Sequence, residues 1–207
     1  MGTYQEIKLS KDVEEVVLSY SKDVTYIANG GEDQHLQMIY PSKTEQEKKY
    51  PVILYVLEGD QEAIYNKIPS LTKFAQRGYV IAMVVARKES DKEQENEYEA
   101  VLEFLQKNGE FYHLNMEQLF VLRDSMLIGE SSKSLVIKKL EEKQLFKGIK
   151  AFISFGGSEE VKKLSNDVLN CPPILCVRGN GDLADQNRWW SEDNLDVLED
   201  FMSNYIS

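Results

Sequence analysis

A serine stands where an apolar run is expected to turn sharply into a helix. Residues 126–128 are apolar, and Gly129-Glu130-Ser131-Ser132 follows them directly. On such a strand-to-helix turn the serine hydroxyl projects above the sheet, and small residues two places either side let the turn close. Gly129 meets this requirement, whereas Lys133 does not. Ser131 is therefore either a candidate nucleophile or a serine that caps the following helix.

A serine nucleophile needs a base to take its proton, and histidine is the usual base near neutral pH. The chain contains only two histidines, His35 and His113. The sequence pattern places His35 in an N-terminal hairpin. It places His113 before the strand that leads to Gly129, at the opposite end of the expected sheet. Both are predicted to be structural or surface residues, so no base for Ser131 is evident.

The elements that position these residues follow from hydrophobic patterning. Alternating runs on either side of the Gly-rich residues 29–31 predict an antiparallel hairpin. Later continuous apolar runs are typical of strands covered on both faces, and helical patterns separate most of them. We therefore expect an α/β fold of one domain over residues 1–207, with a mostly parallel sheet and an antiparallel start. The predicted strands are 24–28, 35–40, 51–57, 79–86, 119–128, 150–155 and 173–177, and the predicted helices are 64–77, 98–105, 135–145 and 194–206.

Composition excludes several classes of function. Lys plus Arg number 24 against 35 Asp plus Glu, which gives a net charge of −11 and argues against nucleic acid or an anionic membrane as a main partner. No run approaches the ~20 apolar residues of a membrane helix, and no signal peptide is visible, so a cytoplasmic location is expected. Cys171 and Cys176 are expected to be reduced thiols, and neither a metal nor a cofactor is predicted.

Four segments together resemble the α/β-hydrolase fold, and within it the small acetyl-esterase and feruloyl-esterase-like lipases. The resemblance implies a three-layer sandwich, a serine carboxylic-ester hydrolase activity, and a small ester or other ligand as partner. The four segments are residues 31–41 (GEDQHLQMIYP), 50–56 (YPVILYV), 77–82 (RGYVIA) and 172–182 (PPILCVRGNGD).

The resemblance also implies a role for several residues. Ser131 takes the position of the nucleophile and Asp182 that of the triad acid. The backbone N–H of Ser132 would donate to the oxyanion, with a second donor expected from Gly59-Asp60. Two such donors would stabilise the charge that develops on the substrate oxygen.

Ser125 is a rival nucleophile. It lies in Arg123-Asp124-Ser125-Met126-Leu127 and lacks a glycine on both sides. Ser131 keeps one of the two glycines and is the preferred candidate.

Three departures from the family pattern weaken the enzyme interpretation. Residues 57–60 read Leu-Glu-Gly-Asp where the family has His-Gly-Gly-Gly, so two carboxylates stand where an oxyanion would form. Lys133 replaces the second glycine of the serine turn. No histidine follows Asp182, and residues 183–193 are too few for the family's final strand and histidine loop, which are expected to be shortened.

Two functions therefore remain open. One is a carboxylic-ester hydrolase that is weak or inactive for lack of a triad histidine. The other is a non-catalytic hydrolase-fold protein that binds a small molecule or a partner. Trp189 and Trp190 could line a pocket or pack against the last helix, and the sequence does not fix the oligomeric state.

Overall fold

The computed structural model describes residues 3–5, 17–27, 33–42, 48–58, 61–86, 91–124, 148–155, 172–177 and 192–206. They form an eight-stranded sheet in the order β1-β2-β3-β5-β4-β6-β7-β8. The strands β5, β4, β6, β7 and β8 are mutually parallel, whereas β1, β2 and β3 are antiparallel. The strands are β1 (Thr3–Gln5), β2 (Leu18–Ile27), β3 (Asp33–Pro41), β4 (Tyr50–Glu58), β5 (Val80–Ala86), β6 (Leu114–Asp124), β7 (Ile149–Phe155) and β8 (Ile174–Val177), and the helices are α1 (Gln61–Gln76), α2 (Asp91–Lys107) and α5 (Glu192–Ser203).

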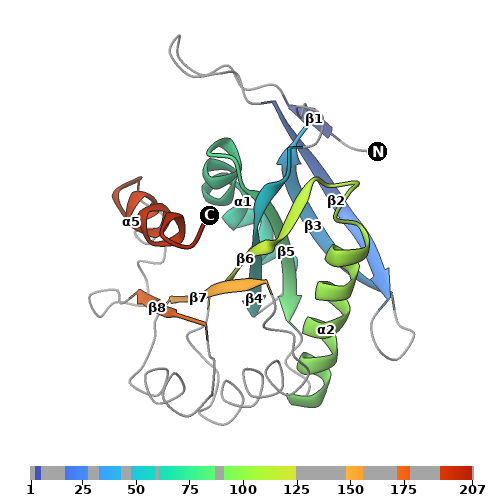
Figure 1. The fold of residues 1–207 in the computed structure, drawn as a ribbon. Coiled ribbons are helices and arrows are strands. Elements are labelled where there is room, and N and C mark those ends of the chain that lie inside the picture. Colours follow the sequence, from blue (N-terminus) through green and yellow to red (C-terminus); the bar gives the residue numbers. More distant parts are fainter. Residues whose placement is uncertain are drawn as a thin grey trace.

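Helices cover both faces of the sheet, so the described residues form three layers (Figure 1). One buried cluster, the α2-side core, joins α2 to one face of the sheet. A second cluster, the α1-side core, joins α1 and α5 to the other face. The predicted three-layer α/β architecture, mostly parallel with an antiparallel start, is confirmed.

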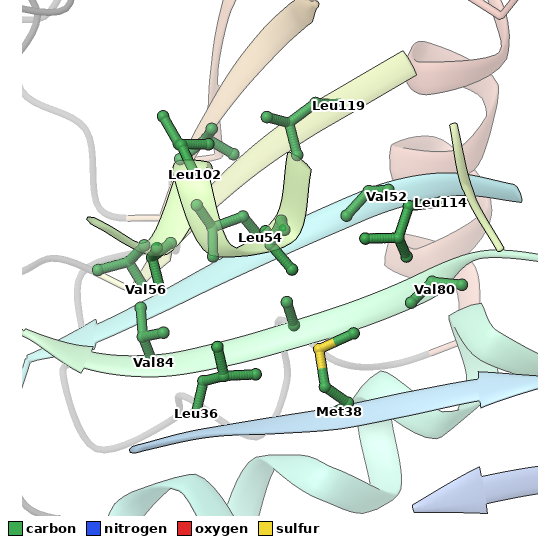
Figure 2. Close-up of a cluster of buried hydrophobic side chains, with 14 of the residues drawn as sticks. Leu36, Met38, Val52, Leu54, Val56, Val80, Val84, Leu102, Leu114 and Leu119 are labelled. Carbon is green, nitrogen blue, oxygen red and sulfur yellow. The ribbon is translucent and has the colours of Figure 1, made fainter. Parts of the chain in front are cut away.

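The sequence of β4 is apolar from Val52 to Leu57 because the strand is buried on both faces. Val52, Leu54 and Val56 enter the α2-side core beside Leu102 of α2 (Figure 2). The intervening residues Ile53, Tyr55 and Leu57 enter the α1-side core. Every residue from Val52 to Leu57 is at most 5% exposed. Because successive side chains of a strand point to opposite faces, a strand covered on both faces must be apolar at every position.

The parallel register aligns the carboxyl ends of the central strands. Glu58 of β4 pairs with Ala86 of β5. Leu57 of β4 pairs with Asp124 of β6, and Asp124 pairs in turn with Phe155 of β7. Phe155 then pairs with Val177 of β8. These strands therefore finish within about one residue of each other along one edge of the sheet.

The turn between α1 and β5 is fixed by Gly78. Gly78 has a φ of +93°, a left-handed conformation that glycine adopts without steric cost. Its N–H donates to the Ala75 carbonyl at 3.1 Å, and the N–H of Tyr79 donates to the Phe74 carbonyl at 3.2 Å. The rings of Phe74 and Tyr79 then meet edge to face at 6.1 Å. This pattern of bonds and the accompanying apolar contact define a Schellman C-cap.

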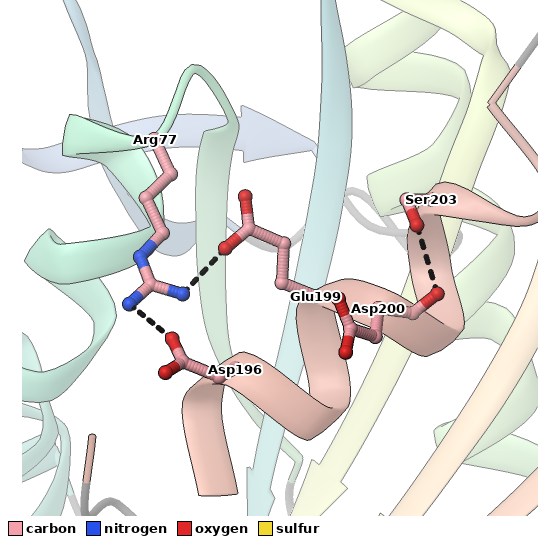
Figure 3. Close-up of polar contacts among 5 residues, drawn as sticks. All are labelled: Arg77, Asp196, Glu199, Asp200 and Ser203. Carbon is pink, nitrogen blue, oxygen red and sulfur yellow. Dashed lines mark hydrogen bonds and ion pairs between the residues drawn. The ribbon is translucent and has the colours of Figure 1, made fainter. Parts of the chain in front are cut away.

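Helix α5 is attached to the α1-side layer by apolar and ionic contacts. Leu195, Leu198 and Met202 are at most 1% exposed within the α1-side core. Arg77 lies just after α1. One of its guanidinium nitrogens donates a hydrogen bond to Asp196 at 2.6 Å, and the other donates one to Glu199 (Figure 3). One arginine thus holds two carboxylates one helical turn apart.

The described strands differ from the predicted ones in two places. Strand β6 begins at Leu114, five residues before the predicted 119, because its pairing with β4 is irregular between Asn115 and Leu119 and polar residues interrupt the apolar pattern there. Strands β1 and the first half of β2 were not predicted, since β2 is polar there and contains a bulge between Ser21 and Val24. The predicted helix 135–145, the predicted strand residues 125–128 and the shortened region after Asp182 lie outside the described residues, and they stay predictions.

Replacing Gly148 by alanine should strongly destabilise the fold. Gly148 has a φ of +96°, and a Cβ there would lie 2.1 Å from the carbonyl oxygen of Met116. Strain of this kind costs on the order of 1–3 kcal/mol or more. We expect Gly148→Ala to lower the free energy of unfolding, measured in urea, by at least about 2 kcal/mol. Gly109→Ala is the matched control, because its added Cβ meets neighbours at 3.4–3.9 Å, and it should change stability by less than about 0.5 kcal/mol. Equal effects of the two substitutions would contradict the prediction.

Removing the Arg77 guanidinium should loosen α5. Arg77→Gln loses two charge-assisted hydrogen bonds, so we expect a loss of about 1–2 kcal/mol in low salt that shrinks at high salt. The control is Lys107→Gln, which removes an exposed ion pair to Glu103 within α2 at 3.3 Å and should cost no more than about 0.5 kcal/mol. Urea unfolding at two salt concentrations measures both. A loss for Arg77→Gln that does not depend on salt would argue against the ionic contribution.

Candidate active site at the carboxyl ends of the parallel strands

In open α/β sheets, ligands bind outside the carboxyl ends of the strands. In this chain the segments after β4, β6 and β8 carry the residues predicted for the site. Gly59 and Asp60 directly follow β4, and Ser125 directly follows the last described residue of β6. Asp182 comes five residues after Val177, the end of β8. The aligned strand ends therefore deliver these three segments to the same edge of the sheet.

All predicted site residues lie outside the described part of the chain. These residues are Ser131, Asp182, Ser132, Gly59, Asp60 and Ser125. Their roles stay predictions, and the described strand ends constrain them only through register.

The strand ends set the spacing between the predicted nucleophile and acid. Asp124 pairs with Phe155, and Phe155 pairs with Val177, so β6 and β8 are separated by β7. Two strand spacings amount to about 10 Å. In a serine triad an imidazole stands between the serine and the acid and hydrogen-bonds to both. An imidazole would therefore have to bridge the distance between the segments that follow β6 and β8.

His35 lies at the correct edge of the sheet but on the wrong strand. Its neighbour Leu36 pairs with Val84, which places His35 level with Val85 and therefore with the ends of the parallel strands. However, β5 and β4 lie between β3 and β6 in the sheet, so three strand spacings, roughly 14 Å, separate His35 from Asp124. The imidazole is exposed, and its Nδ1 lies 3.4 Å from the Thr25 hydroxyl of β2. His35 is a surface residue, as predicted.

His113 lies at the opposite edge. It immediately precedes β6, and its carbonyl accepts a hydrogen bond from the N–H of Tyr50, the first residue of β4, at 2.8 Å. Its φ of 55° closes the turn that follows α2, and its own N–H donates to the Glu110 carbonyl at 3.3 Å. Leu114 pairs with Tyr50 and Asp124 pairs with Leu57, so the length of β4 between these partners, roughly 23 Å, separates the two ends of β6. The prediction that His113 lies at the far end of the sheet is confirmed.

Two adjacent strands, β4 and β6, end in acidic residues. Glu58 is the last residue of β4, and Asp124 is the last described residue of the adjacent strand β6. The half-buried Arg123 precedes Asp124, in register with Val56 and Ser154. Arg123 also stands two residues before Ser125, where a serine turn favours a small residue.

Among the described residues, no three His, Cys, Asp or Glu side chains gather as a metal ion would need. Within the same ranges, no helix is long and apolar enough to cross a membrane.

Comparison with known proteins identifies the fold. No protein-family model and no curated protein matches the chain. Among solved structures, a fungal esterase from Rhizomucor miehei superposes with a TM-score of 0.64 at 14% identity, over 94% of this chain and 85% of that one. An esterase from Pyrobaculum calidifontis gives a TM-score of 0.64 at 11% identity, over 90% and 84% of the two chains. Brefeldin A esterase, a bacterial homologue of human hormone-sensitive lipase, gives 0.51 at 16% identity, over 73% and 43%.

At these identities the likeness establishes the fold. The chain has the α/β-hydrolase fold, in agreement with the resemblance inferred from its sequence. The fold by itself does not supply the chemistry, which depends on the residues at the site.

Neither histidine should contribute to ester hydrolysis. We expect a His35→Gln/His113→Asn double variant to hydrolyse a short-chain aryl ester within about twofold of the unmodified chain, because both imidazoles lie far from the carboxyl end of β6. Asparagine is chosen at 113 because it tolerates the left-handed backbone found there. A tenfold or greater loss, with the melting temperature unchanged, would assign a catalytic histidine and contradict the placement.

Proposed function

We propose that this chain binds a small ester, or a related carbonyl compound, at the carboxyl ends of β4, β6 and β8, and that it hydrolyses esters weakly or not at all. The fold supports a ligand at this edge. The limit on activity is supported by the two histidines, which are the only ones in the chain and which both lie away from the end of β6.

Hydrolysis through a serine would require three contributions from the site. The hydroxyl must lose its proton to a base, the acyl group must be held, and two N–H groups must stabilise the oxyanion. General-base catalysis contributes about 10²–10⁴-fold. An oxyanion donor contributes about 3–4 kcal/mol. A carboxylate such as Asp182 is a poor substitute base, because its ordinary pKa is about 3.9.

Negative charge near β4 works against the third of these requirements, oxyanion stabilisation. Glu58 ends β4, and Asp60 lies two residues further on, in the segment proposed to supply an oxyanion donor. Carboxylates beside a developing oxyanion raise its energy. This charge favours the second candidate function, a non-catalytic protein that keeps the ligand site and has lost the reaction.

The register of the sheet bears on which serine is the nucleophile. Ser131 keeps Gly129 before it and is the candidate that the turn motif favours. Asp124 is level with Leu57, so the next residue, Ser125, would be level with the end of β4. Ser131 comes six residues later. The register therefore supports Ser125 as a serious rival, and an experiment must test both serines.

A fluorophosphonate probe and a short-chain aryl ester distinguish the two functions. We expect slow or negligible labelling, and turnover at least about 10²-fold below that of an esterase of the same fold with a complete triad. Any residual labelling should disappear in Ser131→Ala or in Ser125→Ala. Ser134→Ala is the matched control, because it is a nearby serine with no proposed role.

Each outcome has a clear meaning. Turnover comparable with that of the triad-bearing esterase, lost on replacing one of the two serines, would reject the weak or inactive assignment. Identical, negligible signals from the unmodified chain and all three variants would reject the enzyme. Ligand binding can then be measured separately, as a rise in melting temperature of the double serine variant with the intact ester.

A further inference from the structure

A buried polar pair lies between the sheet and α1, away from the candidate site. Gln37 of β3 is 2% exposed and pairs in register with Met83 of β5, a residue of the α1-side core. Tyr20 of β2 packs against the same core and donates a hydrogen bond from its hydroxyl to Oε1 of Gln37. This face therefore carries a buried amide beside residues of the α1-side core.

The amide is only half satisfied by the described residues. Nε2 of Gln37 is buried and has no hydrogen-bond acceptor among them. Exchanging the two amide atoms does not remove the difficulty. Nε2 would then donate to Tyr20, and Oε1 would be the buried atom in need of a partner. A buried polar group without a partner is costly, and in folded proteins ordered water commonly supplies one.

The chemistry of Tyr20 fits a water molecule as the second partner. Burial, together with the neighbouring Tyr65 and Asp23, raises the pKa of the Tyr20 hydroxyl to about 12, so it stays protonated through the neutral range. It donates that proton to Gln37 and keeps lone pairs that can accept another hydrogen bond. The surface beside it is polar as well, because Lys22 lies 5.3 Å from the centre of the Tyr65 ring of α1.

We propose that one internal water molecule binds between Gln37 and Tyr20. Its oxygen accepts from Nε2 of Gln37, and one of its hydrogens is donated to Oη of Tyr20. The amide, the water and the hydroxyl then form a closed ring of three hydrogen bonds. The water belongs to the structure of the sheet and is independent of the proposed function.

A crystal structure at a resolution that orders internal water tests the proposal directly. The expected result is a density peak about 2.7–3.2 Å from both Nε2 of Gln37 and Oη of Tyr20. A dry amide would overturn the proposal. An acceptor supplied to Nε2 by another part of the chain would do the same.

The direction of a change in melting temperature tests the proposal independently. In the unmodified chain, Gln37→Met removes the amide with little change in shape. If water satisfies the amide, the melting temperature should fall by about 2–4 °C. If the amide is dry, the substitution removes a buried unpaired group and the melting temperature should rise, which would overturn the proposal. Ile39→Met in the same background measures the separate effect of placing methionine on this face.

Discussion

Burial of the central strands on both faces is the constraint on which the rest of the structure depends. Side chains of β4 alternate between two apolar cores, so a slip of one residue would send every side chain to the wrong core. The same holds for β5 and β6, its neighbours on either side. Register is therefore fixed at the centre of the sheet, and the alignment of the carboxyl ends follows from it.

That alignment makes the distribution of histidines informative. Because the register is fixed, the order of the strands determines the distance between their ends. A side chain on β3 cannot reach the end of β6 across two intervening strands. The fold thus supplies the edge at which ligands bind in open α/β sheets, and the imidazole of His35, which lies at this edge, is three strand spacings away from β6. The framework and the chemistry are separable, because the fold fixes the ends of the strands and not the residues that follow them.

Much of the fold could be predicted from sequence because the signals are local. The continuous apolar run from Val52 to Leu57 indicates a strand covered on both faces, and Gly78 indicates the end of α1. The position of His35 relative to the carboxyl ends of the parallel strands could not be predicted. It depends on β3 pairing with β5 rather than with β4, its neighbour in sequence. The bulge at Lys22 and Asp23 of β2 could not be predicted either, because the extra residue is evident only from the pairing of β2 with β3. The candidate site rests on motifs that lie outside the described residues, so the sequence and the register remain its only support.

The attachment of α5 has a consequence for the order in which the chain folds. Arg77 contacts residues that follow it by 119 and 122 positions, and three fully buried side chains of the α1-side core belong to the same late helix. During synthesis the whole sheet emerges before α5 does, so one of its faces stays partly uncovered until then. A nascent chain at that stage exposes an apolar surface that chaperones recognise. Docking of this helix, a contact of long sequence separation, is a natural late step in folding.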